Sequence, residues 1–209
     1  MVQHSDVKSS VQLYEARSFK LPKLEGISED QIAVHLKLYQ GYVTAFNEMR
    51  QAEVELAQDA QKNKHALAEL RRRRSFEFDG MRMHELYFAQ FEGGKNHGAE
   101  DSPFAAAVKK QFGGLRRCDE IVKYVGMSRG IGWTVLYYDD EADLFLVHWV
   151  TDHEIGQLAG VPILLAMDMW EHAYMVDYVP AEKEKYIDAF LQNVNWKIVE
   201  ERYDAVRVS

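Results

Sequence analysis

The sequence has little of what builds a disulfide-linked, membrane-spanning or nucleic-acid-binding protein. Its single cysteine, Cys118, excludes an internal disulfide framework and a cysteine-rich zinc site, and suits a reducing compartment, where it is expected to be a small buried side chain. The most apolar run, residues 161–167, is far too short to cross a bilayer. With 25 Lys and Arg against 33 Asp and Glu, the net charge of −8 argues against broad attraction to nucleic acid or an anionic membrane.

Targeting signals and two familiar catalytic patterns are also lacking. The amino terminus, MVQHSDVKSS, has no apolar stretch typical of a secretory signal, so a cytoplasmic location is expected. There is no Gly-x-Ser-x-Gly motif of a serine hydrolase and no pair of Glu-x-x-His motifs of a di-iron bundle. The 209 residues, 47% hydrophobic and 28% charged, are typical of a globular protein of one large or two small domains.

Proline is scarce, and none occurs between Pro22 and Pro103, so long helices are expected there. Ser28 and Gln31 resemble a capping box that begins the first helix. One face of this helix repeats at three- and four-residue steps and comprises Ile32, His35, Tyr39, Tyr42, Phe46 and Met49.

A second helix is expected from about residue 64. Gly80, His84, Tyr87 and Phe91 share one of its faces, and the glycine pair at 93–94 is expected to end it. Two long helices in succession predict an antiparallel hairpin.

The second half of the chain predicts a mixed domain. The polar segment 95–101 is the expected domain boundary, which divides the chain into residues 1–95 and 96–209. Aromatic and β-branched residues at 133–138 and 144–150 predict a β-hairpin, and residues 161–167 a third strand, antiparallel like the others. Ser102 and Pro103 begin one helix, and Pro180 begins a last helical stretch that runs through Trp196.

Four polar side chains form a candidate metal site. Asp168 follows an apolar strand, and His172, four residues later, is expected one turn into the following helix, so the two side chains can converge on one point. A helix cap beside a hydrogen-bonded histidine explains the same spacing. His35 and His84 lie on the inward faces of the two helices, where each ring requires a partner. Three imidazoles and a carboxylate suit iron, manganese or zinc.

Four strings, ISEDQIAVH, GMRMHELYF, GIGWTVLYYDD and DMWEHAY, resemble the iron/manganese superoxide dismutases, and the resemblance spans residues 20–203. It implies that His35, His84, Asp168 and His172 are the metal ligands, with a solvent molecule as the fifth. It also implies a helical hairpin followed by an α/β domain with a three-stranded antiparallel sheet and flanking helices. The implied reaction converts superoxide to oxygen and hydrogen peroxide as the metal cycles between trivalent and divalent states.

The same resemblance implies roles around the metal. Gly80 stands where one iron branch of the family has a glutamine that tunes the redox potential of the metal, and His153 matches the branch that uses a histidine for this role. This match favours iron over manganese, with one ion per subunit. Tyr42 corresponds to the tyrosine that lines the substrate channel, although it follows His35 by seven residues and not the usual eight; Tyr39 is the alternative.

Trp133 and Trp170 match tryptophans that line the metal pocket. Glu171 matches a glutamate that bonds His172 of the partner subunit across a two-fold axis, so a homodimer or a tetramer of such dimers is expected. Met175 replaces the usual interface tyrosine.

Three lysines are candidates for guiding an anionic substrate to the metal. The arginine that many relatives carry shortly before Tyr186 is absent, and Lys37, Lys183 and Lys185 are the candidate guiding cations. The basic run at 71–74 is expected to be a solvated helix surface, because four consecutive residues point around the whole helix.

Two other functions remain open. One is a non-enzymatic structural protein on the dismutase fold, against which the retained ligands argue. The other is a zinc hydrolase, for which His153 is the one general base that the sequence offers.

Overall fold

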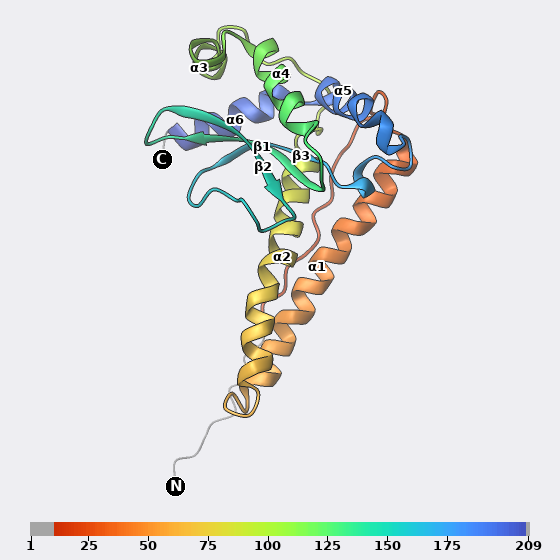
Figure 1. Ribbon diagram of the computed structural model, residues 1–209, viewed down its shortest axis with the longest axis vertical. Coiled ribbons are helices and arrows are strands. Elements are labelled where there is room, and N and C mark those ends of the chain that lie inside the picture. Colours follow the sequence, from red (N-terminus) through yellow and green to blue (C-terminus); the bar gives the residue numbers. More distant parts are fainter. Residues whose placement is uncertain (1–10, 208–209) are drawn as a thin grey trace.

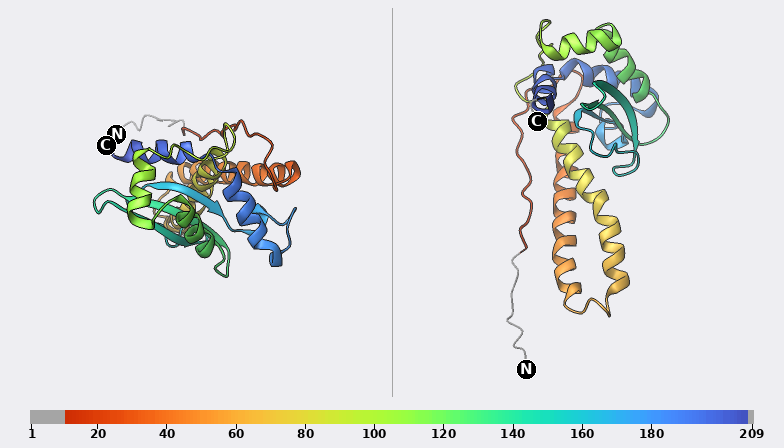
Figure 2. Two further views of the ribbon diagram at one scale, coloured as in Figure 1. Left: turned by 90° about the horizontal axis from the view of Figure 1, so that it is seen from above. Right: turned by 90° about the vertical axis from the view of Figure 1, so that its left-hand side faces the viewer.

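The computed structural model describes residues 11–207 and places two long helices beneath a small sheet (Figure 1). Helices α1 (Glu29–Ala57) and α2 (Lys64–Ala89) lie side by side and antiparallel, and extend away from the sheet, while the segment before α1 runs alongside them (Figure 2). The helical hairpin expected from the sequence is therefore confirmed. The amino-terminal segment used to argue against a secretory signal lies outside the described residues. No helix within residues 11–207 is long and apolar enough to span a membrane.

Helix α1 begins where the capping pattern places it, but the cap is only half formed. The Ser28 side chain accepts a hydrogen bond from the Gln31 backbone N–H, as expected. The Gln31 side chain does not return to Ser28, whose own N–H donates to Asp177. Gln31 is almost fully buried and bonds a loop far along the chain, so tertiary contacts take its amide away from the cap.

Helix α2 ends at Ala89, earlier than the glycine pair that was expected to end it. The reason is Gln90, whose side-chain amide donates to the Ala166 carbonyl and accepts from the Ala166 N–H. Its backbone carbonyl accepts a bond from the Asn195 N–H. These bonds to distant segments hold Gln90 in place and stabilise the helix end at Ala89 more than a further helical turn would.

The sheet consists of β1 (Gly132–Asp139), β2 (Leu144–Thr151) and β3 (Ile163–Asp168) in the order β2-β1-β3. Both neighbours of β1 run antiparallel to it, which confirms the expected three-stranded antiparallel sheet. In the register of β1 and β3, Trp133 lies opposite Asp168. Asp168 is therefore the last residue of the strand and not the first residue beyond it.

The remaining helices pack around the sheet and the upper end of the hairpin (Figure 1). They are α3 (Pro103–Phe112), α4 (Leu115–Gly126), α5 (Lys183–Asn193) and α6 (Trp196–Arg207), with short 3-10 helices at Glu171–Ala173 (η1) and Pro180–Glu182 (η2). The expectation of one continuous last helical stretch was wrong. The chain is extended at Val194, with ψ of 130°, and the next residue, Asn195, donates to Gln90.

One buried cluster joins the hairpin to the sheet. It contains Tyr39 of α1, Tyr87 and Phe88 of α2, Trp133 of β1 and Phe190 of α5, all with no exposed surface. The junction of α1, α2 and β3 is thus a dry, aromatic-rich region in which a polar side chain needs a specific partner. The boundary between residues 95 and 96 stays a prediction.

Candidate metal centre

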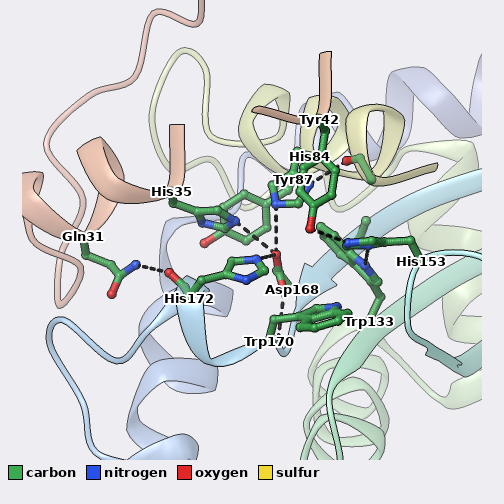
Figure 3. Close-up of polar contacts among 12 residues, drawn as sticks. Gln31, His35, Tyr42, His84, Tyr87, Trp133, His153, Asp168, Trp170 and His172 are labelled. Atoms are coloured by element: carbon green, nitrogen blue, oxygen red, sulfur yellow. Dashed lines mark hydrogen bonds and ion pairs between the residues drawn. The ribbon is translucent and has the colours of Figure 1, made fainter. Parts of the chain in front are cut away.

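Four side chains from four different elements meet at this junction (Figure 3). His35 comes from α1, His84 from α2, Asp168 from the end of β3 and His172 from η1. The Nε2 atoms of His35, His172 and His84 lie 3.0, 3.1 and 3.4 Å from Asp168 Oδ2. One potential ligand atom of each residue lies within 4.8 Å of all the others, and we call these four residues the ligand cluster.

The cluster presents lone pairs that protein partners leave unused. His84 Nδ1 is bonded to the Gly80 carbonyl at 2.6 Å, so the neutral ring carries its proton there and turns the Nε2 lone pair into the cluster. His84 Nε2 is buried without a hydrogen-bond partner among the described residues. Two ligand atoms that are each about 2.0–2.2 Å from a shared metal ion are at most about 4.4 Å apart. This is close to the 4.8 Å within which the ligand atoms of the cluster lie. The donors therefore fit a single ion of a first-row metal.

Burial sets the charge of the cluster. Desolvation lowers the pKa of His35 and lowers that of His84 well below its ordinary value, so both rings are neutral and able to bind a metal at neutral pH. Burial alone raises the pKa of Asp168, but the adjacent His172 and His35 rings outweigh it and hold that pKa far below the usual range. The site thus holds one buried carboxylate charge beside the neutral rings of His35 and His84, which suits a cation.

Three further bonds hold the ligands in place. Gln31 Nε2 donates to the His172 carbonyl at 2.6 Å and so ties α1 to η1. The Tyr186 hydroxyl donates to the Asp168 backbone carbonyl at 2.8 Å, and the backbone N–H of Trp170 donates to Asp168 Oδ1 at 2.8 Å. Sequence reasoning missed Gln31 and Tyr186 as positioning residues. The signal that could have found Gln31 is its place four residues before His35, on the inward face of α1.

A second chain of hydrogen bonds lies beside the ligand cluster (Figure 3). Trp133 Nε1–H donates to His153 Nδ1 at 3.0 Å, and His153 Nε2 lies 2.7 Å from the Tyr42 hydroxyl. Because Nδ1 accepts, the neutral ring carries its proton on Nε2 and donates it to Tyr42. Desolvation lowers the pKa of His153 to about 4, which keeps the ring neutral, and burial raises the pKa of Tyr42.

Tyr42 faces the ligand cluster and Tyr39 does not. The Tyr42 ring lies 5.1 Å from the His84 ring. A Cβ added at Gly80 would lie 2.6 Å from Cδ1 of Tyr42, so the absence of a side chain at Gly80 makes room for that ring. Tyr39 is fully buried and its hydroxyl instead accepts from the Arg17 N–H and donates to Glu85. The continuous helix α1 thus brings the seven-residue spacing from His35 onto the metal side.

The other predicted site residues surround this arrangement. Trp170 stacks on both His153 and His172, with ring centroids 5.1 and 5.7 Å apart. Glu171 is exposed beside His172 and has no side-chain hydrogen bond among the described residues. His172 lies in a 3-10 turn of three residues and not in an α-helix as the spacing suggested. It keeps 19% of its side chain exposed, so the cluster is closest to solvent at this ligand.

Comparisons with known proteins agree with this geometry. Residues 100–202 match the family model described as iron/manganese superoxide dismutases, C-terminal domain. The chain is 34% identical over 191 residues to the superoxide dismutase [Fe] of Aquifex pyrophilus, with 88% of each chain covered. It is 31% identical over 207 residues to that of Methanothermobacter marburgensis, covering 91% of this chain and 98% of the relative. It is 32% identical over 186 residues to that of Cupriavidus metallidurans, covering 88% and 91%. With a matching family model and this extent of identity, the chain belongs to the iron/manganese superoxide dismutase family.

Proposed function

We propose that this protein is an iron-dependent superoxide dismutase whose ligand cluster holds one metal ion per chain. The observation that carries the proposal is the convergence of three imidazole nitrogens on one buried carboxylate oxygen at 3.0–3.4 Å. Iron bound there supplies a one-electron couple, the chemistry that converts superoxide to oxygen and hydrogen peroxide. The names of the relatives, superoxide dismutase [Fe], support iron over manganese. A non-enzymatic protein on this fold has no need of buried, unpartnered imidazole nitrogens.

The protein must also deliver protons, because peroxide formation consumes two of them for each pair of superoxide ions. The direction of the Trp133, His153 and Tyr42 chain supports a role for Tyr42 as donor. The Tyr42 oxygen accepts from His153, so its own proton is free to point toward a bound anion. The raised pKa of Tyr42 keeps this proton in place until it is needed. His153 fixes the orientation of the phenol, and Trp133 fixes the tautomer of His153.

The tryptophans exclude water from the reacting region. Trp133 has no exposed surface, and Trp170 covers the rings of His153 and His172. Asp168, held at both its carbonyl and its Oδ1 atom, gives the site a fixed negative charge and an acceptor for a proton on bound solvent. Together these residues provide a dry site with one fixed charge and one proton donor.

The proposed assembly is a homodimer, or a tetramer of such dimers, in the cytoplasm. Its support is the surface beside His172, where Met175, Val176 and Val179 are 50–57% exposed. Such an apolar surface is typical of an interface between subunits. In the dimer, Glu171 bonds His172 of the partner subunit. The single, buried cysteine suits the reducing cytoplasm.

The experiment compares His84→Ala and Asp168→Ala with a control, His65→Ala, which removes an exposed histidine from the same helix as His84. Metal per chain is measured by mass spectrometry, and activity by the decay of a superoxide pulse. Both ligand variants should lose metal and activity, whereas the control should keep both. Full metal occupancy in either ligand variant would refute the assignment of the cluster. A parent protein that binds metal without activity would instead favour the structural alternative.

Separate reconstitution of the unfolded apoprotein with iron and with manganese tests the choice of metal. Activity per bound ion should be higher with iron. An active manganese form beside an inactive iron form would contradict this part of the proposal.

A further inference from the structure

The proposed substrate is an anion, yet the chain carries a net charge of −8. Fast capture of superoxide then needs a local cation beside the reacting groups. Lys37, one of the three lysines suggested by the sequence, is exposed on α1, and the other two are engaged with other groups. Lys183 Nζ donates to the Ser128 carbonyl and lies over Trp149, and Lys185 pairs with Glu182 at 2.6 Å.

A cation from the basic run of α2 lies near the Tyr42 and His153 pair. The Arg73 guanidinium lies 3.6 Å from the centroid of the Phe76 ring. The Phe76 ring in turn lies 4.6 Å from the His153 ring and 6.2 Å from that of Tyr42. A single aromatic ring therefore separates this positive charge from the hydrogen-bonded pair.

The neighbours of Arg73 face other ways, as expected for consecutive residues on a helix. Arg71 and Arg74 both bind Glu53 of α1, at 2.7 Å each. Arg72 pairs with Glu69 on the exposed surface at 2.6 Å. Arg72 lies on the solvated helix surface expected for this run, with 66% of its side chain exposed. Arg73 is less exposed, at 37%.

The charge of Arg73 reaches both members of the pair. Burial raises the pKa of Tyr42, and Arg73 acts against this increase. Burial lowers the pKa of His153, and Arg73 lowers it further. The contribution of Arg73 at the Tyr42 hydroxyl is therefore positive, the sign that attracts a superoxide ion. Larger negative effects there come from three carboxylates, Asp168, Glu77 and Asp152. Glu77 lies 3.2 Å from Arg73 and offsets part of its charge.

We propose that Arg73 is the steering residue of the enzyme, which attracts the superoxide anion to the side of the site formed by Phe76, Tyr42 and His153. The ring of Phe76 holds the guanidinium in position, and Glu77 sets how much of its charge is felt. The inference rests on the proposed function and adds to it a residue outside the positions assigned by the family resemblance.

The expected effect follows from the distance and the solvent. A unit charge about 10 Å from an anion in a water-like medium changes the local anion concentration about twofold, and more where protein replaces water. Arg73→Gln should therefore lower kcat/KM about two- to fivefold at low salt. The loss should fade as ionic strength rises from about 0.01 to 0.1 M, because the screening length falls from about 30 to 10 Å. Arg73→Lys should restore most of the rate, and Glu77→Gln should increase it.

Arg72→Gln is the matched control, because it makes the same change in net charge on the adjacent residue of the same helix. The assay is the superoxide decay rate of the metal-loaded protein over a range of ionic strengths, with metal content measured in parallel. A second readout, free of turnover, is the affinity for azide, a small anion, followed by the absorption spectrum of the metal-loaded protein. Arg73→Gln should weaken azide binding about twofold at low salt, and Arg72→Gln should not.

Equal rates and equal salt dependence in Arg73→Gln and Arg72→Gln would overturn the inference. So would failure of Arg73→Lys to restore the salt dependence, because the effect would then come from packing on Phe76 and not from charge. An inactive parent protein is a different outcome, which refutes the proposed function and the inference that rests on it.

Discussion

Gly80→Ala is the substitution with the sharpest consequence, because Gly80 supports both the metal ligand and the proton donor. Its carbonyl bonds His84 Nδ1, and its missing side chain leaves room for Tyr42. A Cβ at this position would lie 2.6, 2.8 and 3.0 Å from three carbons of the Tyr42 ring. The backbone carbonyl is unchanged by the substitution, so metal binding should be retained while Tyr42 is displaced.

The magnitude follows from these contacts. Restoring ordinary contact, at 3.4 Å or more, requires a shift of the Tyr42 ring of at least about 0.8 Å from the 2.6 Å approach. Such a shift stretches the 2.7 Å bond to His153 to about the limit of a hydrogen bond. A positioned proton donor contributes about 10²–10⁴-fold to a rate, and alanine displaces Tyr42 without removing it, so activity should fall about 10- to 100-fold. Crowding costs about 1–3 kcal/mol, and the helix preference of alanine returns about 0.5–1 kcal/mol.

The assay compares Gly80→Ala with Gly41→Ala, a control on α1 whose added Cβ meets nothing within 4 Å. The control should keep full activity and gain about 0.5–1 kcal/mol in free energy of unfolding from helix preference alone. Activity per bound metal, metal content and thermal unfolding are measured for both variants. Full activity of Gly80→Ala with its metal bound would refute the argument that the position of Tyr42 controls the rate. Loss of metal in that variant would instead show that the added Cβ also displaces the Gly80 carbonyl that positions His84.

Three further predictions follow from the same contacts. Trp133→Phe keeps a ring in the pocket but removes the hydrogen-bond donor to His153 Nδ1. Activity should fall at unchanged metal content, and the free energy of unfolding should fall by about 1–3 kcal/mol. An unchanged rate would contradict the proposed role of the His153 tautomer. The pKa of His153 is lowered to about 4 in the folded protein, so below about pH 6.5 the unfolded chain binds a proton that the folded protein does not. The free energy of unfolding should therefore decrease between about pH 6.5 and 4, by at most about 1.4 kcal/mol per pH unit. Urea unfolding at pH 7 and pH 5 should therefore differ less for His153→Gln than for the parent, and an equal difference would contradict the assignment. Cys118 has no exposed surface and burial raises the pKa of its thiol to about 12, so a thiol reagent should modify the native protein far more slowly than the unfolded one.

The sequence by itself determined the elements and the chemistry of the candidate site. The gap in proline before Pro103, together with the helical spacing of His35 and His84, predicted the hairpin, because periodicity and helix-breaking residues act locally. Aromatic and β-branched runs predicted three strands for the same reason. The types of the four residues of the ligand cluster, and the strings that contain them, were likewise available from the sequence alone.

Only the tertiary structure decided where the elements end and what each polar side chain contacts. Helix α2 stops at Ala89 because Gln90 bonds residues of β3 and of the segment after α5, and no local pattern encodes such distant partners. The amide of Gln31 leaves its capping box for the His172 carbonyl for the same reason. Equally, four consecutive arginines look alike in the sequence, yet packing of α2 against its neighbours leaves one of them, Arg73, on the ring beside His153. A helix distributes consecutive side chains over its whole circumference, so which of them faces a site is set by what the helix packs against.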